Sequence, residues 1–161
     1  MRREVFVSYS RKDRKWLDRL LVIFKPLQRS SSLTVWADVD IGVGALWRTE
    51  LEKALDRALV AVLLVSADFL ASDFIMDEEV PKLLRNAEER GTIIMPVILG
   101  PSLFEQSSIG IFQSINPVEL PLSKLPTYQR DEFFVRLANT ISDMFGRYQR
   151  AELAHLARWV W

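Results

Sequence analysis

The sequence predicts an α/β fold in which helices cover both faces of a parallel sheet. The first observation is the uninterrupted apolar run Leu59–Val65, which is rich in β-branched residues. Such a run is typical of a strand buried on both faces, as in the middle of a parallel sheet. The second observation is that short β-forming runs alternate along the chain with segments of helical periodicity. This alternation, with short turns between, indicates strand–helix–strand units.

The N-terminal part contains two predicted strands with one helix between them. The strands are Glu4–Ser10, which ends in hydroxyl side chains, and Leu33–Ala37. Asp13 is a plausible N-cap for the helix. Pro26 and Ser30–Ser32 are expected to end it. The apolar positions of this helix recur at helical spacing and are Leu17, Leu20, Leu21 and Phe24.

Three further helices are expected. One follows the loop Asp38–Trp47, and its apolar stripe consists of Trp47, Leu51, Ala54, Leu55 and Ala58. The next opens around the acidic cluster Asp77–Glu79, with a late start favoured by Pro81. It closes at Gly91, where a left-handed residue is expected. The last is an amphipathic helix whose buried face consists of Phe134, Leu137, Ile141 and Phe145.

The remaining strands are expected at Thr92–Leu99 and, as a short one, around Ser114–Asn116. With five parallel strands, the flavodoxin-like order 2-1-3-4-5 is the natural prediction.

One domain accounts for most of the 161 residues. We assign residues 1–145 to it and residues 146–161 to a C-terminal helical extension or linker. Leu153, Leu156 and Val160 would form an additional helical face there, and Trp159 and Trp161 would be costly to expose. This segment is interpreted as a docking segment or as the remainder of a longer parent protein.

The composition excludes several classes of function. The formal net charge is +0, so nothing favours binding to nucleic acid or to an anionic membrane. The absence of cysteine excludes thiol nucleophiles and zinc–thiolate sites and suits a reducing compartment. The single histidine, His155, lies far from the other polar clusters, and no metal site is expected. No apolar run reaches the length of a membrane span. We expect a cytoplasmic protein.

Glu79 is the strongest candidate for a catalytic group. The core stripe of its helix is Val80, Leu83, Leu84 and Ala87, and a helix turns about 100° per residue. Glu78 then points roughly away from the core, whereas Glu79 lies about a quarter-turn from the stripe, at its edge. The alternative is that an acid in the first turn of a helix only complements the helix dipole.

Two loops provide candidate ligand contacts. Gly42 and Gly44 permit a close backbone approach to a ligand, so the acids Asp38 and Asp40 of that loop are candidates. A loop that is merely a flexible connection explains Asp38 and Asp40 equally well, and Trp47 is better explained as a core residue on the stripe of its helix. The other candidates lie at the C-terminal end of the first strand and are Ser8, Tyr9, Ser10 and Arg11. Hydroxyl groups there could line a ligand crevice, although loops are often rich in serine. No dinucleotide-binding Gly-x-Gly-x-x-Gly and no phosphate-binding loop is present. A phospho-receiver domain would need an aspartate where this chain has Ser66.

Taken together, these segments resemble a Toll/interleukin-1 receptor (TIR) domain, and more closely the bacterial kind. The resemblance covers about residues 4 to 145, and its main segments are VFVSYSRKD, VWADVDIGVGALW and LEKALDRALVAVLLVSADFLASDFIMDEEVPKLL.

The resemblance implies a catalytic glutamate on the helix after the third strand, which falls on Glu79. A gapless alignment from Phe74, which stands where many members have tryptophan, gives Glu78 instead. The helical-face argument favours Glu79. The ligand-lining residues of the family would fall on Ser8, Tyr9, Ser10, Arg11, Asp38, Asp40 and Trp47.

The activity implied is an NAD+ glycohydrolase that needs no metal or cofactor. It would cleave the nicotinamide–ribose bond of NAD+ when several TIR domains associate as a homo-oligomer or filament, in bacterial antiviral immunity or cell suicide. ADP-ribose and a cyclised form are both possible products, and a regulatory or sensor domain beyond the C-terminus is a possible partner. The alternative is an adaptor that only binds other TIR domains. A nucleoside deoxyribosyltransferase-like enzyme shares the topology but explains the Asp38–Trp47 loop less well.

Overall fold

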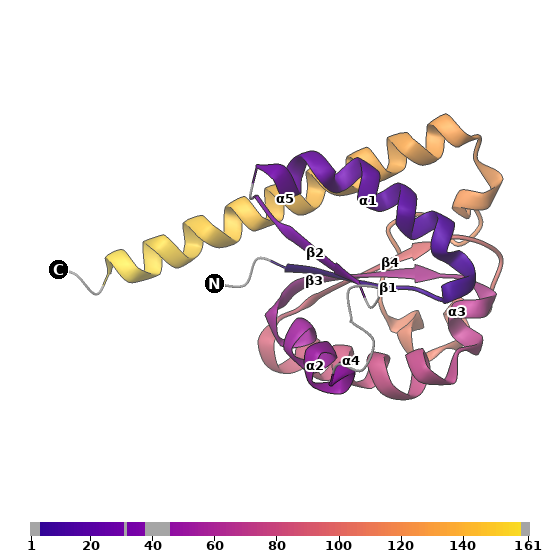
Figure 1. The fold of residues 1–161 in the computed structure, drawn as a ribbon, viewed down its shortest axis with the longest axis horizontal. Helices are drawn as coiled ribbons and strands as arrows, with labels where there is room; N and C mark the ends of the chain where they lie inside the picture. Colours follow the sequence, from indigo (N-terminus) through magenta and orange to yellow (C-terminus); the bar gives the residue numbers. More distant parts are fainter. Residues whose placement is uncertain (1–3, 31, 38–45, 159–161) are drawn as a thin grey trace.

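The computed structural model describes residues 4–30, 32–37 and 46–158, and within these ranges it has three layers (Figure 1). The middle layer is a parallel sheet of order β2-β1-β3-β4. Its strands are β1 (Glu4–Ser8), β2 (Thr34–Ala37), β3 (Ala58–Val65) and β4 (Ile93–Ile98). Every residue of β3 is buried, which confirms the prediction made from its apolar run.

One face of the sheet is covered by the helices α1 (Arg14–Arg29) and α5 (Thr127–Ala157). The sequence suggested that Pro26 and the serines after it end α1. Pro26 instead lies within the helix, which ends at the serines, with Ser30 as its C-cap. The hydrogen bond that this proline cannot donate would go to Val22. Val22 is 60% exposed, so water can take that bond and the helix continues to Arg29.

The other face is covered by α2 (Trp47–Arg57) and α4 (Val80–Arg90). The short helix α3 (Ala67–Ala71) follows β3, and a π-helical turn, η3 (Ile75–Glu79), leads directly into α4. The regular α-helix thus begins at Val80 with Pro81 in its first turn, as the late start requires, although helical structure already begins at Asp73, before the acidic cluster. Gly91 ends α4 with φ of 71°, the left-handed conformation that was predicted.

The fifth strand predicted around Ser114–Asn116 is not found in the described residues, so the sheet there has four strands. The side chain of Asn116 occupies part of its place beside β4. Its Oδ1 accepts a hydrogen bond from the Ile98 N–H at 2.8 Å. Its Nδ2 donates to the carbonyls of Ile98 and Leu120 at 3.0 and 3.1 Å. Pro117 follows and has no N–H to extend a strand ladder.

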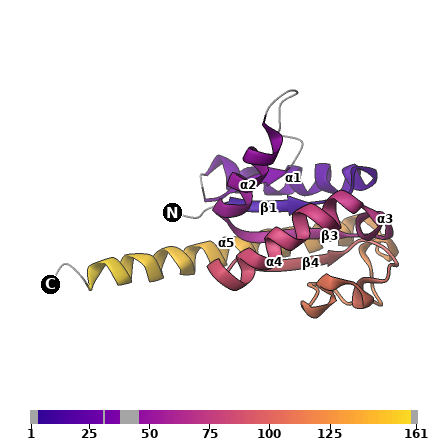
Figure 2. The ribbon, with the colours of Figure 1, turned by 90° about the horizontal axis from the view of Figure 1, so that it is seen from below.

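The last helix, α5, has 31 residues and extends well beyond the sheet (Figure 2). Its N-terminal part buries the predicted face, which consists of Phe134, Leu137, Ile141 and Phe145. In the projecting half, Leu153 and Leu156 are 54% and 61% exposed. The division between residues 1–145 and 146–161 thus falls inside one continuous helix, and the separate extension stays a prediction. Four 3-10 turns complete the described elements: η1 (Arg11–Asp13), η4 (Phe104–Gln106), η5 (Ser108–Ile111) and η6 (Leu122–Lys124).

Candidate functional site

Glu79 is the last residue of the π turn and is almost fully buried, with 2% of its surface exposed. In this turn the Val80 N–H donates to the carbonyl of Ile75, five residues back. A π turn holds more residues than an α turn, so Glu79 is rotated from the edge position expected for a regular helix. Its neighbour Glu78 is half-buried. Pro81 explains the turn, because its ring would clash with the carbonyl four residues earlier in a regular helix.

The carboxylate of Glu79 is held by Ser8, the last residue of β1. The Ser8 hydroxyl donates to Oε2 of Glu79 at 2.6 Å, and this contact is buried. Alternate residues of a strand face the same side of the sheet, and Phe6, two residues earlier, packs into the core on the α2–α4 side. Ser8 therefore points toward the start of α4. The contact joins the carboxyl end of β1 to the π turn, 71 residues apart in the sequence.

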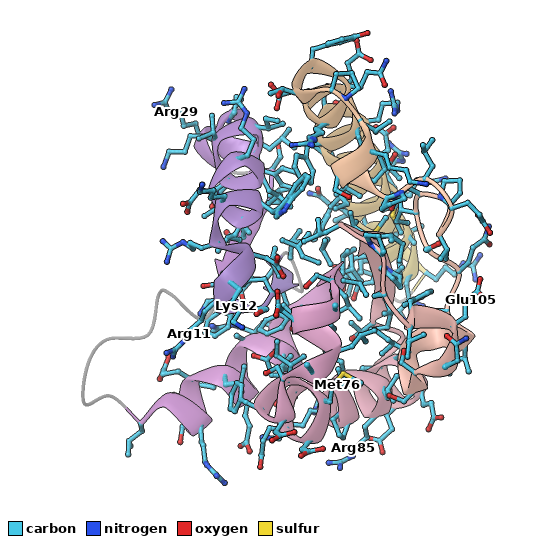
Figure 3. All side chains as sticks on the ribbon, turned by 90° about the vertical axis from the view of Figure 1, so that its right-hand side faces the viewer. Arg11, Lys12, Arg29, Met76, Arg85 and Glu105 are labelled. Carbon is cyan, nitrogen blue, oxygen red and sulfur yellow. The ribbon has the colours of Figure 1, made fainter. Side chains whose placement is uncertain are left out.

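The residues after Ser8 lie in different surroundings. Tyr9 is 5% exposed and packs into the core on the α1–α5 side of the sheet. Ser10 is the N-cap of η1, where its Oγ accepts from the Lys12 N–H at 3.3 Å. Arg11 is exposed. Figure 3 places Arg11 and Lys12 near the N-terminal end of α1 and Arg29 near its other end.

The acids Asp38 and Asp40 lie outside the described residues. Trp47 is the first residue of α2, but its side chain is likewise outside the described part of the structure. Phe74, which precedes the π turn, is 37% exposed. The roles predicted for these residues stay predictions.

A second carboxylate at the same edge belongs to Asp13, for which the sequence predicted only a role as helix N-cap. Asp13 precedes α1 but makes no side-chain capping bond to it. Instead, its Oδ2 accepts from the Ser66 hydroxyl at 2.5 Å. Ser66 in turn caps α3 by accepting from the Phe69 N–H at 3.0 Å. A signal for this contact existed, since Asp13 and Ser66 follow the carboxyl ends of two strands that the predicted order makes neighbours.

Burial raises the pKa of the Asp13 carboxyl above its ordinary value, and the nearby charge of Asp68 raises it further. The hydrogen bond from Ser66 lowers this pKa, but its effect is smaller than that of burial. Asp68 is itself paired with Lys12, at 3.5 Å between Nζ and Oδ1. Two side-chain contacts at this edge, Asp13–Ser66 and Lys12–Asp68, thus join the β1–α1 connection to the start of α3.

The described residues contain no group of three or more acidic or histidine side chains placed to hold a metal ion. Within the same ranges no helix has both the length and the apolar character of a membrane span. What the edge offers chemically is a buried carboxylate in a fixed orientation. In open α/β sheets, ligands bind beyond the carboxyl ends of the strands, which is where this carboxylate lies.

Comparison with solved structures relates the fold to known TIR domains. The TIR domains of the activated Roq1 resistosome, which directly recognizes the pathogen effector XopQ, match with a TM-score of 0.54 and 21% identity over 85% of this chain and 84% of that one. The TIR domain heterodimer of RPS4 and RRS1 matches with a TM-score of 0.51 and 20% identity, covering 86% of this chain and 98% of the other. At these identities the likeness supports the fold alone.

Sequence comparison extends over nearly the whole chain. An uncharacterized protein of Sinorhizobium fredii, y4lF, is 29% identical over 154 residues, which is 96% of this chain and 47% of that protein. The chain thus spans about half the length of this curated relative. The family model for the TIR domain matches residues 5–136. With most of its length matched by that model, from β1 into α5, the chain belongs to the TIR domain family.

Proposed function

We propose that this TIR domain is an NAD+ glycohydrolase whose catalytic carboxylate is Glu79. The TIR family includes enzymes that cleave NAD. The observation that carries the proposal is the position of Glu79, a carboxylate that is 2% exposed and held by Ser8 beyond the end of β1. Burial of an acid is costly, and an apolar side chain would be more stable there. Acids retained in such places are candidates for functional groups.

The chemistry suits a single carboxylate. Nicotinamide leaves NAD+ as a neutral molecule from a cationic ring, so its departure needs little help from an acid. The ribose passes through a state that resembles an oxocarbenium ion, as in glycoside cleavage. A carboxylate near the ribose stabilises that positive charge as it develops. Loss of this carboxylate should raise the barrier by about 3 kcal/mol or more, which is roughly a hundredfold in rate.

We further propose that self-association activates the enzyme. In the isolated chain, Glu79 has almost no contact with solvent, so NAD+ reaches it only after a change of conformation. TIR domains form assemblies in similar proteins, as in the Roq1 resistosome and the RPS4–RRS1 heterodimer. Packing of one copy against another supplies the free energy for such a change. A role in bacterial immunity or cell suicide would suit a reaction that consumes NAD+ only on assembly.

The second candidate function is that of an adaptor that binds other TIR domains without catalysis. The similarity to the RPS4–RRS1 heterodimer favours it. In that case the Ser8–Glu79 contact serves only to join β1 to the π turn.

The experiment that separates the two functions is a nicotinamide-release assay over a wide range of protein concentration. The enzyme should release nicotinamide from NAD+, with a rate per molecule that rises with concentration. Glu79→Gln, which keeps the size of the side chain, should lower this rate about a hundredfold or more. Glu78→Ala is the matched control and should retain activity. Absence of release from the wild type at every concentration, also when it is assembled, would favour the adaptor.

A further inference from the structure

Ser8 is placed to act on Glu79 and not on a ligand. Only 1% of its surface is exposed, and its side chain lies between β1 and the start of α4. A serine hydroxyl has a single hydrogen, and in Ser8 that hydrogen is donated to Oε2 of Glu79. The Ser8 hydroxyl therefore has no further hydrogen to donate to a ligand.

The contact has the properties of a bond that fixes a carboxylate. Its length, 2.6 Å, lies at the short end of the range for hydrogen bonds donated by a hydroxyl. Ser8 is held by β1, which pairs with a strand on each side. Glu79, in contrast, has a long side chain at the end of an irregular turn. The rigid partner thus sets the orientation of the flexible one.

We propose that Ser8 is a positioning residue, which orients the Glu79 carboxylate for reaction with the ribose without contacting NAD+. This inference rests on the function proposed above. A group that stabilises charge in a transition state must be oriented before the reaction begins. A displacement of about 1 Å at such a group costs about a hundredfold in rate.

The test compares Ser8→Ala, Ser8→Cys and Ser102→Ala in the same assay with saturating and limiting NAD+. Ser8→Ala should lower kcat by about 10- to 100-fold with little change in KM. Ser8→Cys, which is nearly the same size but a weaker donor, should be intermediate. Ser102→Ala is the control, because its Oγ is buried without a hydrogen-bond partner, and it should behave as the wild type. Thermal unfolding of each variant verifies that it is folded.

A double variant makes the test specific. If Ser8 acts through Glu79, then Ser8→Ala should have no further effect on the rate once Glu79→Gln is present. Equal effects of Ser8→Ala in both backgrounds would refute the inference, and so would a raised KM with unchanged kcat, which would mean that Ser8 contacts NAD+. An active wild type whose rate is unaffected by Ser8→Ala would refute this inference alone. An inactive wild type would refute the proposed function and the inference with it.

Discussion

Two buried or partly buried acids lie at the carboxyl edge of the sheet, and each accepts a hydrogen bond from a serine. Glu79 pairs with Ser8, and Asp13 pairs with Ser66. The two serines end neighbouring strands or follow them directly, since Ser8 closes β1 and Ser66 comes after β3. Serine side chains at the ends of strands thus bind acids that lie at the ends of the short helical turns η1 and η3.

The raised pKa of Asp13 has a consequence for stability. A group that binds its proton more tightly when folded stabilises the fold below its unfolded pKa. That contribution is lost as the pH rises through the higher, folded pKa. Above that pKa the charge of Asp13 weakens the fold, chiefly because burial disfavours the ionised form.

Asp13→Asn should remove this penalty, because an amide oxygen can still accept from Ser66. We expect a small rise in the melting temperature at pH 7 that shrinks as the pH is lowered and disappears below 3.8, the ordinary value for this carboxyl. Melting temperatures measured across a pH series would test this, with the exposed Asp77→Asn as control. A lower melting temperature at every pH would mean that the carboxylate itself is needed.

At the scale of elements, regular patterns predicted the fold well. The uninterrupted run of β3 and the apolar faces of α1 and α5 are buried as expected, apart from Leu21 of α1, which is half-buried. Two irregular features could not be predicted from the sequence pattern, because they arise from the chemistry of single side chains and not from periodicity. Pro81 gives rise to a π turn that moves Glu79 inward, and Asn116 replaces the fifth strand with a pair of side-chain hydrogen bonds to Ile98.

Asn116→Ala should destabilise the protein, because it leaves the N–H and carbonyl of Ile98 without these partners. The expected cost is about 1–3 kcal/mol in the free energy of unfolding. Urea unfolding would measure it, with Asn139→Ala at an exposed position of α5 as control. A loss no larger than that of the control would show that water or the chain itself replaces these bonds.

Pro81→Ala tests whether the π turn places Glu79. Alanine restores an N–H and removes the ring, so the turn can relax to a regular helix with Glu79 at its edge. We expect unchanged or higher stability together with a loss of NAD+ cleavage of about tenfold or more. Arg85→Ala, at an exposed position of α4, is the control. Retained activity would mean that the turn persists without the proline.

At the scale of the whole molecule, α5 continues well beyond the sheet that it covers. Tyr148 still packs against the core, whereas the described side chains from Gln149 onward are exposed apart from a half-buried Glu152. The sequence pattern predicted a division near residue 145 but could not reveal that one helix runs across it.

A chain that ends at Tyr148 should therefore melt within a few degrees of the full chain, because it loses little buried apolar surface. A chain that ends at Ile141 should melt clearly lower, since it loses Phe145, which is 6% exposed. Melting temperatures of the two truncated chains test this. A large loss on removal of residues 149–161 would mean that the projecting helix stabilises the domain.

The most direct test of the account is the rate of nicotinamide release from NAD+ by concentrated wild-type protein and by Glu79→Gln. The wild type should release nicotinamide, and the rate should fall about a hundredfold or more in the variant, with both proteins folded. Equal rates for the two proteins, or no release by the wild type under any condition of assembly, would contradict it.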